Sequence, residues 1–117
     1  MTQHLTVTTS TSPAGAVIAL TGDLDHHTTP QVRTALGELN LLAGQQLVLD
    51  LGALTFCDST GITVLIAARN HALAANATIA LTAVPDRVSR IFRIVGLDQV
   101  FTTYPTTQEA EAARHPA

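Results

Sequence analysis

The sequence predicts one α/β domain over residues 1–117, with a mixed, mostly parallel sheet of roughly four to five strands and about four helices. Apolar runs of strand length alternate along the chain with segments whose apolar residues recur every three or four positions. The chain has 117 residues, 46% of them hydrophobic, which is enough to cover one sheet with helices. Strands joined by helices imply right-handed crossovers, so the expected order is β-β-α-β-α-β-α-β-α.

The first part of the chain predicts a hairpin followed by a helix. Leu5–Thr9 and Ala16–Gly22 read as strands, and the Pro and Gly of residues 12–15 indicate a turn between them. Such a short connection cannot cross over, so these two strands should be antiparallel. The helix should begin at residues 28–30, with threonine as the cap and proline in its first turn, and run through Leu42 to Gly44.

The remaining elements continue the alternation. A buried strand covers Leu47–Asp50 and is followed by a short connection, after which a helix begins near Ser59 and closes at Asn76. Pro85 and Asp86 open a third helix that Gly96 should stop. The other expected elements are a strand at 77–82, a short strand around Val100 and Phe101, and a last helix from about Thr107 to Arg114.

The tetrapeptide 58–61, Asp-Ser-Thr-Gly, stands where an apolar run ends and a helical pattern begins. Asp58 and Ser59 are therefore both candidates for the helix cap. A helix N-terminus presents free N–H groups and the positive end of the macrodipole, so it tolerates an added phosphate well. The alternative is that Ser59 only starts the helix, a role worth about 1 kcal/mol.

Together with Gly22-Asp23-Leu24-Asp25 about thirty residues upstream, this motif resembles the single-domain anti-sigma factor antagonists, whose fold is called the STAS domain. The resemblance spans roughly Leu5 to Tyr104. In that family the serine of a D-S-[ST]-G motif is the regulatory phosphorylation site. The resemblance therefore implies phosphorylation at Ser59, with Thr60 as the competing acceptor.

The resemblance also implies a surface that meets the anti-sigma factor. It assigns partner binding to the upstream loop and to the motif itself, at Asp23, Asp25, Asp58, Thr60 and Gly61. Asp23 stands where relatives often carry glutamate, which shortens the side chain and keeps its charge. Asp58 either caps the helix or aligns the serine for a kinase, and Gly61 either admits the partner's backbone or reflects tight packing.

The function that the resemblance implies is a phosphorylation-controlled binding protein with no cofactor of its own. Its unphosphorylated form would bind an anti-sigma factor that is also a serine kinase of the GHKL ATPase type, and so release a sigma factor. Phosphorylation would break the complex, and a PP2C-type phosphatase would restore it. The alternative is a STAS-type structural subunit of a lipid transport complex or a signalling scaffold, and the retained Ser59 favours the switch.

Composition argues against several other classes. A net charge of −3 and the absence of lysine argue against nucleic acid as a partner. The chain has no apolar run approaching a membrane span, so we expect no membrane insertion and a cytoplasmic protein. An enzyme is not expected, because the nucleophile elbow needs a G-x-S-x-G frame and Cys57 stands where its first glycine belongs.

Three further features have ordinary structural interpretations. The two carboxylates and two imidazoles within residues 23–27 invite a metal site, but no ligands fixed by rigid elements and no supporting outer residues accompany them, so a polar recognition loop is favoured. Cys57 reads as a small buried apolar residue. Arg87, Arg90 and Arg93 recur every third residue and predict a solvated helix face, or in a functional interpretation a docking patch for an acidic partner.

Overall fold

The first two strands form the predicted antiparallel hairpin. In the computed structural model, which describes residues 4–114, β1 (Leu5–Ser12) pairs with β2 (Gly15–Leu24) along its whole length. Gly15 has a φ of +140° and lies directly against the backbone of Gln46, where a side chain has no room. The ends of the predicted domain, 1–3 and 115–117, lie outside the described residues.

The remaining strands join β2 in parallel, as expected. β3 (Gln46–Cys57), β4 (Thr78–Thr82) and β5 (Thr103–Tyr104) complete a five-stranded sheet in the order β1-β2-β3-β4-β5. The connections are helical, which confirms the predicted order of elements. They comprise α1 (Thr29–Gly37), α2 (Ser59–Ala74), α3 (Asp86–Val95) and the short 3-10 helix η1 (Leu97–Gln99), and a last helix, α4 (Thr107–Ala112), follows β5.

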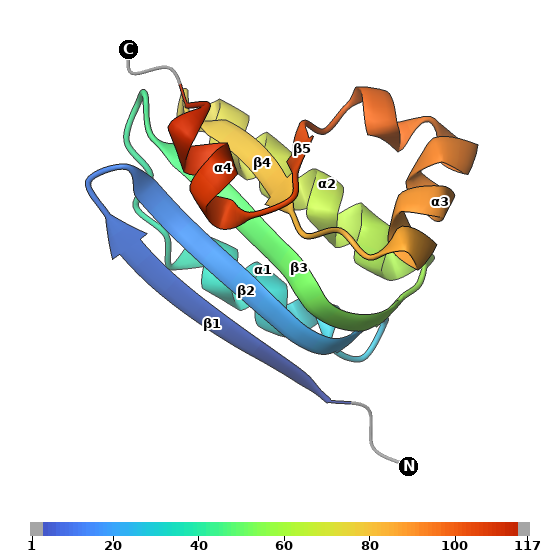
Figure 1. Ribbon diagram of the computed structural model, residues 1–117. Helices are drawn as coiled ribbons and strands as arrows, with labels where there is room; N and C mark the ends of the chain where they lie inside the picture. The colour runs from blue at the N-terminus through green and yellow to red at the C-terminus, as the bar shows by residue number, and fades with distance from the viewer. Residues whose placement is uncertain (1–3, 115–117) are drawn as a thin grey trace.

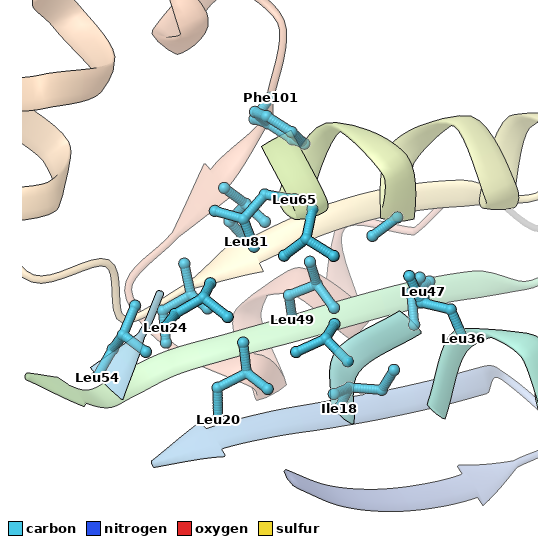
Figure 2. Close-up of a cluster of buried hydrophobic side chains, with 14 of the residues drawn as sticks. Ile18, Leu20, Leu24, Leu36, Leu47, Leu49, Leu54, Leu65, Leu81 and Phe101 are labelled. Atoms are coloured by element: carbon cyan, nitrogen blue, oxygen red, sulfur yellow. The ribbon is translucent and has the colours of Figure 1, made fainter. Parts of the chain in front are cut away.

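Helices cover both faces of this sheet (Figure 1). In Figure 1, α1 and α2 lie behind it, α4 lies in front of it, and α3 stands to one side. Figure 2 shows the main core between the sheet and the first two helices, where Leu49 and Leu81 lie close to Leu65 of α2. A smaller cluster on the opposite face joins Val48 to Ala110 of α4. Each large core side chain contributes about 1.5–3 kcal/mol through burial.

The first helix is shorter than the sequence predicts. It ends at Gly37, and the expected continuation through Leu42 to Gly44 is wrong. The apolar spacing continues past Gly37, but Leu42 is 65% exposed and belongs to no helix. Its N–H donates to the side chain of Gln45 at 2.8 Å, and the N–H of Gly44 donates to the carbonyl of Asn76 at 3.0 Å. These bonds hold a loop that returns the chain to the sheet.

Other boundaries also differ from the prediction. β3 does not stop at Asp50, because it leaves β4 there and stays paired with β2 as far as Cys57. The last strand is Thr103–Tyr104 and does not include Phe101. Phe101 is buried in the core against Phe92, with ring centroids 6.0 Å apart. The apolar character of Phe101 reflects that core contact. The last helix ends at Ala112, two residues earlier than expected.

The predicted helix boundaries near the middle of the chain are confirmed. Asn76 follows α2 with a φ of +59°, Pro85 precedes α3 as its cap, and Gly96 ends α3 with a φ of +80°. A left-handed glycine after the last turn is a common helix terminator. Over residues 4–114, no helix combines the length and apolar character needed to cross a membrane.

Candidate functional site

Asp58 caps the second long helix at the point where β3 ends. Its backbone is extended, and its Oδ1 accepts bonds from the Gly61 N–H at 2.9 Å and from the Thr60 hydroxyl at 2.6 Å. Partial burial acts to raise the pKa of Asp58, but it is outweighed by bonds from the Thr60 hydroxyl and from the backbone of Gly61, His26 and Thr60. The pKa of Asp58 is therefore lowered, and this carboxylate caps the helix in its charged form.

Ser59 and Thr60 differ in how their hydroxyls are used. Ser59 is the first residue of α2 and is exposed, and no residue of 4–114 hydrogen-bonds its hydroxyl; only its carbonyl is engaged, by Thr63 at 3.0 Å. Thr60 is half-buried and its hydroxyl donates to Asp58. Of the two candidate acceptors, Ser59 is therefore the one whose hydroxyl is free and accessible.

Gly61 is buried and packed against the end of β2. A Cβ at this position would lie 2.7 Å from the Leu24 carbonyl oxygen and 2.9 Å from Cys57 Sγ. Such distances are too short for carbon, so only glycine lets α2 begin this close to the sheet. Of the two interpretations of Gly61, the structure favours tight packing, and the partner-binding assignment does not fit a buried residue.

Cys57 is the small buried residue that the sequence predicts. Burial, with a smaller contribution from the neighbouring charge of Asp58, raises the pKa of its thiol to about 12. The thiol is therefore neutral near pH 7, and it donates to the carbonyl of Asp58 at 3.6 Å.

Asp25 is buried, which makes the prediction of an exposed recognition residue wrong. It is 3% exposed, and its Oδ1 accepts the backbone N–H groups of His27 at 2.9 Å and Thr28 at 3.1 Å. The Thr28 hydroxyl accepts the Asp25 N–H at 2.9 Å and donates to the Asp23 carbonyl at 2.7 Å. Asp25 and Thr28 thus close the turn into α1. The sequence predicted Thr28 only as a helix cap, and its bonds to Asp25 and Asp23 were not expected.

Asp23 lies in β2 and not in a loop, but its side chain is accessible. It is half-buried, and its Oδ1 accepts the hydroxyl of Thr55 on β3 at 2.8 Å. The two motifs meet as expected: Leu24 pairs with Cys57, and the Asp58 N–H donates to the Leu24 carbonyl at 3.2 Å. The turn that contains Ser59 and the turn into α1 therefore lie side by side at one end of the sheet.

A cleft of about 750 Å³ opens beside this turn, between the end of β3 and the start of α3. Phe56 and Cys57 form part of one wall, and Arg87, Arg90 and Ile91 form part of the other. Phe56 is 45% exposed, and both arginines are exposed as predicted for a solvated face. Sequence reasoning missed Phe56, whose signal was an aromatic residue two positions before the motif.

The sequence matches a known family. A family model described as "Mlab, STAS domain" matches residues 7–103. The chain belongs to the STAS domain family. Residues 4–114 form a single α/β domain with a five-stranded mixed sheet, and its structural neighbours have the same fold.

Its relatives in that family are regulatory proteins by name. The chain is 31% identical over 83 residues to an anti-sigma-B factor antagonist of Listeria monocytogenes, which covers 71% of this chain and 73% of the relative. It is 28% identical over 106 residues to the anti-sigma-F factor antagonist RsfB of Mycobacterium tuberculosis, covering 91% and 86%. A crystal structure of an anti-sigma factor antagonist from Mycobacterium paratuberculosis superposes with a TM-score of 0.80 at 26% identity, over 95% and 94% of the two chains.

The two aspartates of β2 and the following turn should respond differently to alanine. Asp25→Ala leaves backbone donors in a buried turn without their acceptor, so it should lower the free energy of unfolding by about 1–3 kcal/mol. Asp23→Ala removes one accessible bond to Thr55 and should cost about 0.5 kcal/mol. Urea titration of both variants measures the contrast, and equal losses would show that Asp25 does not hold the turn.

Proposed function

We propose that this protein is an anti-sigma factor antagonist whose binding is controlled by phosphorylation of Ser59. In its unphosphorylated form it binds an anti-sigma factor that is also a serine kinase of the GHKL ATPase type, and this releases a sigma factor. Phosphorylation of Ser59 breaks the complex, and a PP2C-type phosphatase restores it. The names of the relatives in Listeria and Mycobacterium support the first part of this proposal.

The observation that carries the proposal is the free, exposed hydroxyl of Ser59 at the start of α2. Asp58 caps that helix through Gly61, so the serine is not needed to cap it. A phosphate on Ser59 gains about 0.3–1 kcal/mol from the helix dipole, and the charge of Asp58 opposes it by a similar amount. The domain therefore tolerates the modification at almost no net cost.

The same phosphate is costly once a partner covers it. A dianion enclosed in an interface must lose its water, and without a cationic group opposite it this costs several kcal/mol. We propose that the partner surface consists of the Ser59 turn, Asp23 and the cleft between Phe56 and α3. Asp58 and Thr60 act by positioning Ser59, and Asp25 by holding the adjacent turn.

Ser59 is the expected site of phosphate incorporation. Incubation of the purified protein with ATP and each GHKL-type serine kinase of the source genome, followed by mass spectrometry, should place one phosphate on this residue. Ser59→Ala should abolish incorporation and change the free energy of unfolding by no more than about 0.5 kcal/mol, because the residue is exposed.

Thr60→Val is the matched control, since it keeps the shape of the side chain and removes its hydroxyl. Labelling of this variant should still fall on Ser59, at a lower rate because the bond from Thr60 to Asp58 is lost. Full labelling of the Ser59→Ala protein on Thr60 would reverse the assignment of the acceptor.

Phosphorylation should change affinity and leave the fold unchanged. The two forms are expected to have nearly the same circular dichroism spectrum and melting temperature, because the local charge terms nearly cancel. Affinity for the kinase should fall at least about a hundredfold, or roughly 2.7 kcal/mol. Calorimetric titration of the two forms measures this difference.

Two outcomes would contradict this local account. Chemical-shift changes spread over the whole sheet would show a structural switch in place of an interfacial one. Equal affinity of the two forms for the same partner would instead fit a fixed structural subunit, as in a transport or scaffold complex.

The arginine row of α3 provides a test of the cleft as part of the partner surface. Arg90 lines the cleft and Arg93 does not, although both are exposed on the same helix. If the partner is acidic there, Arg90→Glu should slow association and weaken binding by about fivefold, since exposed charges act mainly on the encounter rate. Arg93→Glu should have a smaller effect in the same stopped-flow measurement. Equal effects would remove the cleft from the interface.

A further inference from the structure

The outer edge of β1 is open along the described chain. Within residues 4–114, β1 pairs only with β2, and the strand order places it at the edge of the sheet (Figure 1). Its sequence, Leu-Thr-Val-Thr-Thr-Ser-Thr-Ser, contains no charged residue or proline, and its register with β2 has no bulge. Proteins usually protect an edge strand with one of these devices. The opposite edge, β5, is only two residues long.

The direction of the free backbone groups follows from the hairpin. The Asp23 N–H donates to the His4 carbonyl at 3.0 Å, so this pair faces inward to β2. In an antiparallel ladder the direction alternates with each residue. The backbone N–H and C=O groups that point away from the sheet are therefore those of Leu5, Val7, Thr9 and Thr11.

We propose that this edge pairs with β1 of a second copy of the chain, antiparallel, around a two-fold axis at Thr8. In this register Leu5 faces Thr11 of the second copy, and Val7 faces Thr9 of the second copy. Every outward N–H and C=O group of β1 then finds a partner. A register centred on Val7 or Thr9 would leave one of the outward residues unpaired.

Self-pairing fits this strand better than pairing with a charged or unrelated segment. A two-fold contact brings the residue on the axis against its own copy, so any charge there would repel itself. Thr8 lies on the axis and is neutral and exposed. The side chains of Val7 and Thr9 also line a groove of about 610 Å³ between β1 and α1, together with Ala35 and Leu39. The proposed register brings the grooves of the two copies together.

Such a dimer goes beyond the proposed function and does not depend on it. Ser59 follows β3, which is separated from β1 by β2, so the pairing leaves the candidate site uncovered. Each dimer would carry two copies of the site. A partner with two binding surfaces would then bind with avidity that a single domain lacks.

Charge substitutions at Thr8 test the axis directly. The unmodified chain should show a monomer–dimer equilibrium in sedimentation equilibrium at up to about 0.5 mM. Thr8→Lys and Thr8→Glu should each raise the dissociation constant about five- to tenfold, because like charges then face each other across the axis. A mixture of the two variants should restore dimers, and native mass spectrometry should show them to be mixed.

Two controls separate the edge from the rest of the surface. Thr21→Lys places the same charge on β2, one strand from the edge, and should leave dimerisation unchanged. Thr9→Pro removes an outward N–H without breaking the bonds to β2, and should give monomers that retain the native circular dichroism spectrum. A monomer at every concentration would overturn the proposal. So would a dimer that neither the Thr8 variants nor Thr9→Pro weakens.

Discussion

The carbonyl oxygen of Leu24 is the point on which the geometry of the site depends. It accepts the N–H of Asp58 at 3.2 Å, and Gly61 packs so closely against it that a Cβ would lie 2.7 Å away. This contact joins the end of β2 to the first turn of α2. It requires β3 to run beside β2 as far as Cys57, well past the point where β4 separates. The long β3 and the glycine at 61 are thus two consequences of one close approach.

Most polar groups around this contact form hydrogen bonds within the protein. The carboxylate of Asp58 binds Gly61 and Thr60, and the carboxylate of Asp25 binds the turn into α1. Ser59 stands among these residues with its hydroxyl exposed to solvent. Its availability is therefore the result of how its neighbours are satisfied: the cap role that serine often has at a helix start is already taken by Asp58.

The sequence predicted those features that depend on local pattern and missed those that depend on packing. The order of elements and the position of Ser59 after a strand and at a helix start follow from periodicity and cap chemistry. The end of α1 was wrong because Leu42 continues the helical spacing, although it lies in an exposed loop. Phe101 was placed in a strand because, in the sequence, an apolar residue that only fills the core cannot be told from one in a short buried strand. Asp25 was expected to be exposed, since sequence cannot show that its own turn would bury it.

The packing beneath α2 determines what kind of switch this site can be. Val64, Leu65 and Ala68 of that helix are fully buried against the sheet. Displacing the helix would expose them, and each large side chain resists exposure with about 1.5–3 kcal/mol. A phosphate at the helix start contributes only about 0.3–1 kcal/mol through the dipole, and the repulsion by Asp58 is of similar size. The charge is too weak to move the helix, so any large effect of phosphorylation must arise where a partner covers Ser59.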